Sequence, residues 1–566
     1  MRTSPAISFF LGLLLSQWLL PAETATRSDR PGDKSSASVQ IEPPSGYQNS
    51  PFSITLSSPV PRVAILFTTN GTDPDLKSGI RYQHPISIKG TTIIQAAGFL
   101  DGAIVGRATA RTYLFIPDIL RQRGDQFPAN WGTNGGRAVP ASYAIAEDTA
   151  QEPASRSAFV EGIKSLPTLS LIADPEKLFG GGHGIYSHPM ERGSAWECSA
   201  AVEMVDSNGD SGFNTICGLR IHGASSRSPE ESPKHSFRLR FRRRYGLGEL
   251  NFPLFGKEKP AEFDTLILRA GNNNSWLHSD GTERQRADYL RDQWMRDTLR
   301  AMGYPAPRGA FVHLYLNGLY WGVYNLCESP GPGFEEKGKA GYDFRKGAKT
   351  KSGDASAWET VLELANSGLT DERNYQSITN QVDLAQFADF MILNFYAGNT
   401  DWDRSANWYA VRPRAPAGKF RFFVWDAERS LEDLHANTLG FDDDESPARL
   451  FQRLSENDNF RRLFAERVRQ WLLGDGVLAP GSAAERYRIL ARNVEKAMAA
   501  EAARWGNYRR RVDRYKTGPY KFYTVAGDWQ PEVDRLLTQY FPQRTSIVLD
   551  QFRERGIFPV EAGLDK

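Results

Sequence analysis

Oxygen-bearing side chains gather in two short segments of the second half of the chain. Asp401 and Asn407 lie in the stretch GNTDWDRSANWYA, and further along Asp426 and Glu428 end the segment FRFFVWDAERS, which is predicted to form a strand. Hard cations such as Mg²⁺ prefer carboxylate and amide oxygens, and phosphotransferases place a catalytic base and a metal-holding amide in one loop. The pattern predicts metal-assisted phosphoryl transfer. The alternative is that these side chains only cap helices and turns.

Two aspartates compete for the role of catalytic base. Asp401 precedes Asn407 by six residues and Asp403 precedes it by four, whereas the catalytic loop of ordinary protein kinases has a spacing of five. We assign the base to Asp401, and Asp403 stays open as the alternative.

A basic hairpin is the third candidate element. In GLRIHGASSRSPEESPKHSFRLRF, one strand runs into a loop with His222 and Arg227, and a second strand begins after Lys234. Hydroxyls, backbone N–H groups and cations at one hairpin tip suit phosphate oxygens. A solvated basic hairpin explains the same residues equally well.

Other signatures of catalysis are missing from the sequence. There is no GxSxG, no HExxH and no paired CxxC, and the KGAKT stretch at residues 346–350 lacks the spacing of a Walker A loop. The GGGHG cluster at residues 180–184 is expected to be a turn.

The elements that must position these residues change type along the chain. From residue 166 to about 330, seven runs have the pattern of strands: LPTLSLIAD, AVEMV, GLRIHG, SFRLRFR, TLILRAG, FVHLYLNG and YWGVYNL. After that the apolar residues recur at helical spacing, as in LAQFADFMILNFYAG and FRRLFAERVRQWLL. We therefore predict a β-rich part followed by a helical part, with Trp321, Tyr324, Trp408 and Trp425 in the core.

The N-terminal region predicts a separate small domain. Residues 39–116 contain seven short β-rich runs, with a strong hairpin signal at Asn70 to Asp73. Such spacing is typical of an antiparallel sandwich. Residues 117–165 are rich in Gly, Pro and Asn, and we expect an irregular connector there.

The first residues have the order of a secretory signal peptide. Arg2 precedes an apolar run from Ile7 to Leu20 and then small residues, so residues 1–25 are predicted to be cleaved on export. The run is short for a membrane span, and an uncleaved anchor is the alternative. Residues 26–38 are expected to form a flexible leader, and the mature protein is expected in the cell envelope or outside the cell.

Composition restricts the partners. The chain has 69 basic and 67 acidic residues, a net charge of +2, so no global field would hold nucleic acid or an anionic membrane. Its three cysteines are too few for a disulfide scaffold. Cys198 and Cys217 form a single bridge in one interpretation, and in the other all three cysteines are buried small hydrophobes.

Taken together and in this order, several stretches resemble the CotH (spore-coat protein H) kinase family. The matching stretches, within residues 166–560, are WECSAAVEMV, IHGASSR with PKHSFRLRF, YGLGELNFPLF, LILRAGNNNSW, LRDQW, VHLYLNGLYWGVYNLCE, NTDWDRSANWY, FFVWDAERSL and YFPQRTSIVLDQFRERGIFP. The resemblance implies an α+β chain with an atypical protein-kinase-like, two-lobed domain. It also implies transfer of the γ-phosphoryl group from ATP to hydroxyls of an exported protein substrate, with Mg²⁺ or Mn²⁺ as cofactor.

The resemblance also implies roles for single residues. Asp401 would accept the proton of the substrate hydroxyl. Asn407 and Asp426 would hold the metal, with Glu428 as a second acidic ligand. Glutamate stands at this last position where the family often has aspartate, and it still offers carboxylate oxygens.

For the nucleotide, the resemblance implies that Arg227 and Lys234 engage phosphates and that Glu328 orients a basic residue. The chain has Lys234-His235 where the family often has two lysines. It also carries Asn272 and Asn273 where an acidic residue is expected, which puts a metal or substrate role of that loop in doubt.

The segment at residues 39–116 resembles the small immunoglobulin-like module of chitobiase-type hexosaminidases, through FTTNGTDP, Tyr82 before Pro85-Ile86, AAGF and Tyr113. A spacer or docking role is our interpretation, and polysaccharide contact is the alternative.

Three hypotheses follow for the whole chain. The first is an ATP-dependent kinase of exported proteins, although extracytoplasmic space holds little ATP. The second is a non-catalytic surface or matrix scaffold that keeps the kinase-like fold for binding. The third is another nucleotidyl or glycan-phosphate transfer at the same acidic site.

Overall fold

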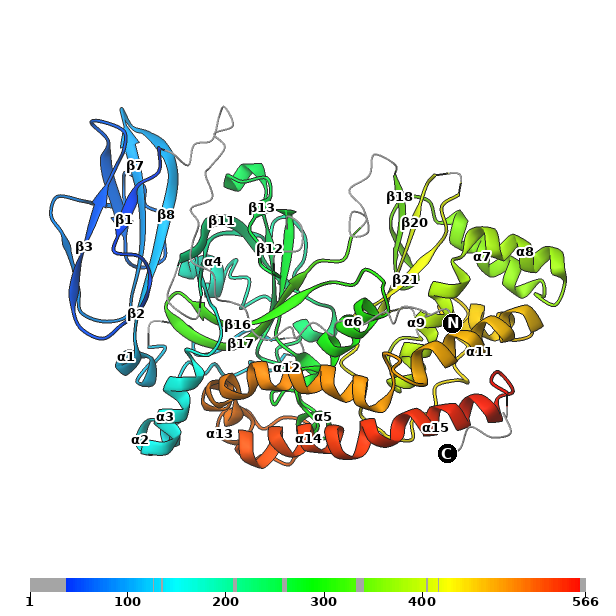
Figure 1. Ribbon diagram of the computed structural model, residues 1–566. Helices are drawn as coiled ribbons and strands as arrows, with labels where there is room; N and C mark the ends of the chain where they lie inside the picture. The colour runs from blue at the N-terminus through cyan, green and yellow to red at the C-terminus, as the bar shows by residue number, and fades with distance from the viewer. Residues whose placement is uncertain are drawn as a thin grey trace, which may run out of the picture.

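The computed structural model describes residues 37–125, 127–133, 136–206, 211–256, 262–331, 341–403, 406–415 and 417–559. The predicted signal peptide and nearly all of the predicted leader lie outside these residues. Figure 1 shows a β-sandwich at one end, a barrel in the middle, a small sheet beyond it and long helices beneath the barrel and the sheet.

The sandwich has the predicted position and one strand more than predicted. Its two sheets have the orders β1-β3-β6 and β2-β8-β7-β4-β5. The strands are β1 (Gln40–Glu42), β2 (Gly46–Gln48), β3 (Phe52–Ser57), β4 (Ala64–Thr68), β5 (Ile80–Arg81), β6 (Ile86–Ile88), β7 (Thr92–Leu100) and β8 (Ala103–Phe115). The stretch Asn70 to Asp73 lies in the connection from β4 to β5, where Gly71 has a φ of +87°. The turn therefore exists, inside a longer connection than a tight hairpin.

The middle of the molecule is a closed barrel in the order β10-β11-β12-β15-β17-β16-β9. The strands are β9 (Thr168–Ile172), β10 (Cys198–Val205), β11 (Ser211–His222), β12 (Ser236–Arg240), β15 (Thr265–Arg269), β16 (Gly309–Leu316) and β17 (Leu319–Glu328). Each of the seven predicted strand runs forms one of them. Alternation explains the barrel wall, since Phe237 and Leu239 are fully buried in its interior while the intervening Arg238 faces outward.

The connector is more ordered than predicted. Residues 117–165 contain most of α1 (Ile116–Leu120), and all of α2 (Glu147–Gln151) and α3 (Pro153–Gly162). Phe159 and Ile163 pack with Tyr320 of the barrel in one buried cluster. The segment is therefore part of the body of the protein, although Gly and Pro are common in it.

The second half of the chain combines helices with a sheet of which only the last strand was predicted. The helices are α5 (Gly281–Gln285), α6 (Arg291–Ala301), α7 (Ser356–Asn366), α8 (Glu372–Gln381), α9 (Leu384–Tyr396), α10 (Pro447–Leu454), α11 (Asp458–Leu472), α12 (Pro480–Glu501), α13 (Tyr508–Arg511), α14 (Gln530–Arg535) and α15 (Phe541–Glu554). Between them, β18 (Tyr342–Lys346), β19 (Lys349–Ser352), β20 (Trp408–Pro413) and β21 (Arg421–Val424) form a four-stranded sheet in the order β19-β18-β20-β21. The helical part predicted after residue 330 is therefore mixed.

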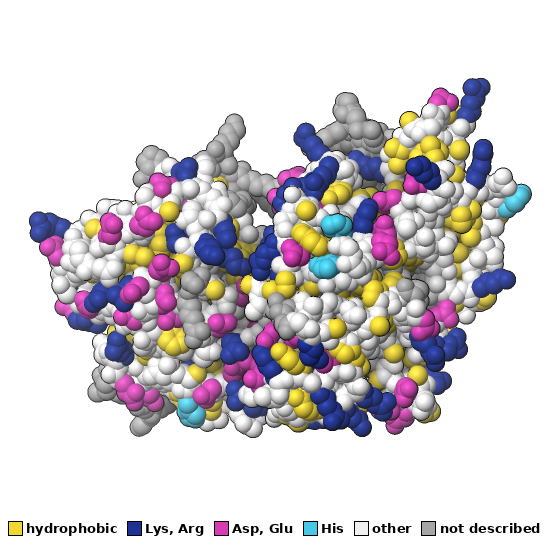
Figure 2. Space-filling model, turned by 180° about the vertical axis from the view of Figure 1, so that it is seen from behind, with side chains coloured by type: hydrophobic (Ala, Val, Ile, Leu, Met, Phe, Trp, Pro, Cys, Tyr) yellow, Lys and Arg dark blue, Asp and Glu magenta, His cyan; other side chains and the backbone are white. Residues whose placement is uncertain are grey.

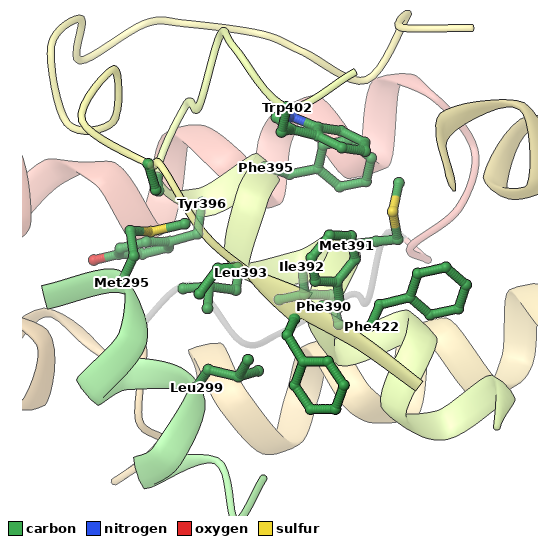
Figure 3. Close-up of a cluster of buried hydrophobic side chains, with 14 of the residues drawn as sticks. Met295, Leu299, Phe390, Met391, Ile392, Leu393, Phe395, Tyr396, Trp402 and Phe422 are labelled. Atoms are coloured by element: carbon green, nitrogen blue, oxygen red, sulfur yellow. The ribbon is translucent and has the colours of Figure 1, made fainter. Parts of the chain in front are cut away.

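The largest core holds α9 against α6 and β21. Figure 3 shows Phe390, Leu393 and Phe395 of α9 among Met295 and Leu299 of α6 and Phe422 of β21. Every residue of α9 except Ala385 is buried. Because α9 is buried on all sides, the core fixes its position, and with it the position of the loop that follows.

Trp321, Tyr324, Trp408 and Trp425 are at most 1% exposed, as predicted. The three cysteines are free and buried, so the Cys198–Cys217 bridge does not form. Their strands pair with Cys198 opposite Leu219 and Ala200 opposite Cys217, which offsets the two thiols. No helix among the described residues is long and apolar enough to cross a membrane.

A buried histidine predicts acid sensitivity of the fold. His313 of β16 contacts the Gly162 carbonyl oxygen through Nε2 (2.8 Å) and the Tyr320 hydroxyl through Nδ1 (3.0 Å). Burial lowers the pKa of His313 to about 4 from its ordinary value of 6.5. Between those pH values the unfolded chain binds a proton that the folded chain does not, so stability falls as pH falls.

Between pH 6.5 and pH 4 the free energy of unfolding should decrease by about 3 kcal/mol less in His313→Gln than in the wild type. Urea unfolding of both proteins across that pH range measures this difference. The exposed His84→Gln is the matched control and should follow the wild-type curve. Parallel curves for wild type and His313→Gln would contradict the prediction.

Candidate functional site

A cleft of about 780 Å³ lies where one end of the barrel meets one end of the four-stranded sheet. On the barrel side, His222 ends β11, Ser236 begins β12 and Arg269 ends β15, and antiparallel pairing brings these three positions to the same rim. The sheet contributes a second rim, because Lys346 ends β18 where Trp408 begins β20 and Val424 ends β21. The register of both sheets thus creates the site.

Asp401 and Asp403 point to different sides of their loop. Trp402 between them is fully buried and packs against Phe390 and Phe395 of α9, with ring centroids 6.1 Å apart in both pairs (Figure 3). Asp401 lines the cleft, and its Oδ2 accepts a hydrogen bond from Nδ2 of Asn407 (2.9 Å).

Asp403 makes its hydrogen bonds outside the cleft. Its Oδ1 accepts hydrogen bonds from the Ser446 hydroxyl (2.8 Å) and from the Asp443 backbone N–H (3.4 Å), and it is not among the residues that line the cleft. Asp403 therefore ties its loop to the start of α10. Of the two candidates for the base, Asp401 alone faces the cleft.

Asp426 and Glu428 both line the cleft, and one guanidinium holds them together. Arg269 donates to Asp426 Oδ1 (2.8 Å) and to Glu428, and it also pairs with Asp292 of α6 (3.4 Å). Its guanidinium lies 4.5 Å from the ring centre of Trp425. Asp292 in turn accepts from the backbone N–H of Ala427 (3.1 Å). The loop after β21 is therefore fixed from both sides.

Backbone strain concentrates at the same place. Asn272, Asn407 and Asp426 all line the cleft and have φ values of +38°, +63° and +55°. Left-handed backbone is unfavourable for residues other than glycine and persists where surrounding contacts impose it, commonly at functional sites. For Asp426 the contact is its ion pair with Arg269, and for Asn407 it is the hydrogen bond to Asp401.

The cleft is strongly cationic. Among the described residues, nine cationic side chains and four carboxylates line it. The cations are Arg192, Arg220, Arg227, Arg238, Arg269, Lys346, Lys349, Lys351 and Arg429; the carboxylates are Glu191, Asp401, Asp426 and Glu428. Figure 2 shows Lys and Arg side chains gathered around the notch between barrel and sheet. Such an excess of positive charge favours an anionic ligand.

The pKa shifts reflect the same field. Burial lowers the pKa of His222 well below its ordinary value, and Arg238, Lys346, Arg269 and Arg227 lower it further. Burial also lowers the pKa of Lys346, which Asp426 opposes and the neighbouring cations reinforce. The cleft therefore holds more positive charge than its own carboxylates neutralise.

The pKa of Glu428 is shifted in the opposite direction, upward. Burial raises the pKa of Glu428 to about 7; the charge of Arg269 opposes this shift, and the charges of Asp292 and Asp426 add to it. Glu428 shares the Arg269 guanidinium with Asp292 and Asp426. Asp292 also pairs with Arg296 (3.0 Å), and Asp426 also lies near Lys346 (3.7 Å).

Arg227 lies in the cleft wall, but its guanidinium is occupied by the backbone. It donates to the carbonyl oxygens of Pro189 (2.7 Å), Glu191 (2.7 Å) and Gly223 (3.0 Å). These bonds join the end of β11 to the segment before β10. The phosphate role expected for Arg227 therefore becomes a structural one.

Lys234 is not brought to the cleft. It is 1% exposed, and its Nζ donates to Glu501 Oε1 at the end of α12 (2.6 Å) and to the Val323 carbonyl oxygen (2.7 Å). The ammonium also lies 4.7 Å from the ring centre of Tyr324. The ammonium is enclosed between β17 and the end of α12, so this cation faces the protein interior and lies outside the cleft.

Glu328 also lies outside the residues that line the cleft. It does orient a basic residue, as expected, since its carboxylate accepts from the guanidinium of Arg308 (2.6 Å) and from the backbone N–H of the same residue (2.7 Å). Arg308 is likewise absent from the cleft, so a role of Glu328 at the nucleotide has no geometric support. The GGGHG turn after α4 (Pro175–Phe179) is also outside the cleft.

The donor set suits a metal ion that arrives with its ligand. In the part of the chain that the structure describes, no three His, Cys, Asp or Glu side chains are grouped as a metal site. Mg²⁺ commonly uses only one or two protein carboxylates and completes its shell with phosphate oxygens and water. Asp401, Asn407 and Asp426 offer such oxygens, and Asn272 Oδ1 in the cleft wall is buried without a hydrogen-bond donor. These residues fit Mg²⁺ or Mn²⁺ bound together with a polyphosphate.

Sequence reasoning missed Arg238, Arg269 and Lys346. The alternation in SFRLRF was a usable signal, because an arginine between two barrel-core residues must face outward. Lys346 belongs to the KGAKT stretch that lacked Walker A spacing, and the structure places it at the tip of the β18–β19 hairpin. Arg269 had no local signal, since its three carboxylate partners come from distant segments.

Two family models match parts of the chain. The model of the chitobiase/beta-hexosaminidase C-terminal domain matches residues 43–109, within the sandwich. A comparison with curated proteins finds no match. The model described as CotH kinase protein matches residues 219–548, which is more than half of the chain and includes the barrel rim, the Asp401 loop and the Asp426 loop. The chain therefore belongs to the CotH kinase protein family.

Proposed function

We propose that this protein transfers the γ-phosphoryl group of ATP to hydroxyl groups of a protein substrate, with Mg²⁺ or Mn²⁺ bound in the cleft. In this proposal the barrel and the part of the chain after it act as the two lobes of a kinase-like domain. The observation that carries it is the single cleft in which Asp401, Asn407 and Asp426 face an excess of cations.

In this proposal Asp401, Arg269 and Lys346 have direct chemical roles. Asp401 accepts the proton of the acceptor hydroxyl as its oxygen bonds to the γ-phosphorus. The bond from that phosphorus to the β–γ bridging oxygen breaks, and ADP leaves with this oxygen. Arg269 and Lys346 stabilise charge on the phosphates, the roles first expected of Arg227 and Lys234.

Asn407 and Asp426, with Glu428 behind them, would hold the metal ion. When bound, the ion neutralises negative charge on the phosphates. Arg269 already pairs with Asp426 and Glu428. It thereby orients both carboxylates toward the cleft before any ligand enters.

Location and partners belong to the same proposal. The signal-peptide pattern and the match of residues 43–109 to a chitobiase-type domain favour an exported protein whose substrate is also exported. The sandwich would then contact polysaccharide or serve as a spacer.

Ligand-dependent stability tests the nucleotide part of the proposal. At 100 times its Kd, Mg-ATP should raise the free energy of unfolding of the wild type by about 2.7 kcal/mol. Asp426→Asn should lose most of this gain, because it removes the charge that faces the metal. Thermal unfolding with Mg-ATP, Mg²⁺ alone, and ATP with EDTA measures the effect. If Mg-ATP at millimolar concentration stabilises neither protein, the scaffold hypothesis replaces the kinase.

A further inference from the structure

The outer strand of the four-stranded sheet borders the cleft. β19 is the edge strand, and β18 is its one strand partner among the residues that the structure describes. Three of its four residues are exposed. An exposed strand edge offers backbone N–H and C=O groups to an extended peptide, which can add to the sheet as another strand.

Two lysines of β19 line the cleft, Lys349 and Lys351. The Thr350 hydroxyl between them accepts a hydrogen bond from Arg345 (2.9 Å) on β18. Lys349 lies opposite Lys346, and Lys351 is the extra residue of a β-bulge between Thr350 and Ser352. A peptide laid along β19 would therefore have two ammonium groups beside it and Asp401 in the same cleft.

The charge of the cleft selects among peptides. The cationic side chains outnumber the carboxylates among the lining residues, and Lys351 is one of the charges that lower the pKa of Lys346. A basic segment would add to this repulsion, and an acidic segment would relieve it. Charge complementarity therefore favours an acidic partner.

We propose that the acceptor protein binds as an extended acidic segment along β19, with its carboxylates on Lys349 and Lys351 and its hydroxyl group directed to Asp401. This inference rests on the proposed function. It names the class of substrate, which neither the catalytic residues nor the family match specifies.

Peptide binding tests it without requiring turnover. The probes are two fluorescent ten-residue peptides with a central serine, one flanked by glutamates and one by lysines, titrated by anisotropy into the full chain with and without Mg-ATP. The acidic peptide should bind at least about tenfold more tightly, and Lys349→Glu/Lys351→Glu should remove that preference. Higher salt should weaken the preference.

Two controls separate this inference from the proposed function. Lys419→Glu/Arg492→Glu makes the same change in net charge at exposed positions outside the cleft and should keep the preference. The stabilisation by Mg-ATP should be equal in wild type and Lys349→Glu/Lys351→Glu. Equal binding of the two peptides to wild type would overturn the inference, and so would a loss of Mg-ATP binding in the lysine variant, which would assign these lysines to the nucleotide. Absent Mg-ATP binding with intact peptide selectivity would instead overturn the kinase function.

Discussion

Replacing Asp401 by asparagine is expected to lower the rate of phosphoryl transfer on the order of 10²- to 10⁴-fold, the usual contribution of a general base. The amide keeps the size of the side chain and the oxygen that can accept from Asn407, but it takes up no proton. Binding of Mg-ATP should be weakened much less than turnover. Transfer of labelled phosphate to a mixture of proteins measures the rate, and thermal unfolding with Mg-ATP measures the binding.

Asp403→Asn is the matched control, since it is the same substitution two residues away. Asp403 accepts from Ser446 and from the Asp443 backbone on the side of its loop away from the cleft. An amide oxygen can accept both bonds, so we expect a change in rate below about tenfold, with some loss of stability. A large loss of rate in Asp403→Asn with little loss in Asp401→Asn would reverse the assignment.

The sequence predicted most of the strands because strand pattern is local. All seven runs from LPTLSLIAD to YWGVYNL form barrel strands, and the apolar run before Asp426 ends as β21. Closure of the barrel was not predictable in this way. It depends on β9 joining β16 in parallel, a pairing between segments more than 140 residues apart. Of the sheet of β18 to β21, only the last strand was predicted. β18, β19 and β20 are short, and three helices lie in the chain between β19 and β20, so their pairing has no local signal.

The acidic residues of the candidate site were predicted from local sequence, and its cations were not. Asp401, Asn407, Asp426 and Glu428 were predicted from their positions beside apolar segments, and all four line the cleft. The cations were predicted less well. A positive charge in a loop does not reveal which way the side chain points, and only the tertiary structure turns Lys234 inward and Arg269 toward the acidic loop.

The buried pair Lys234–Glu501 carries the largest expected effect on stability. Both side chains are fully buried, and Glu501 Oε2 also accepts from the Val323 backbone N–H (2.7 Å). Burial lowers the pKa of Lys234, and Glu501 opposes this shift. Removing one partner leaves an uncompensated charge in the core. Lys234→Met is therefore expected to reduce the free energy of unfolding by about 3–5 kcal/mol.

The double variant Lys234→Met/Glu501→Leu should be less destabilised than either single variant, because it removes both charges and leaves only uncharged groups, the Val323 backbone and the Tyr289 hydroxyl, without these partners. Urea unfolding of all four proteins gives the coupling energy. Additive losses would mean that the two charges are not coupled. The double variant also tests the phosphate role first expected of Lys234. Since the ammonium faces Glu501 and lies outside the cleft, the refolded double variant should bind Mg-ATP as tightly as wild type, and a selective loss of that binding would return Lys234 to the nucleotide site.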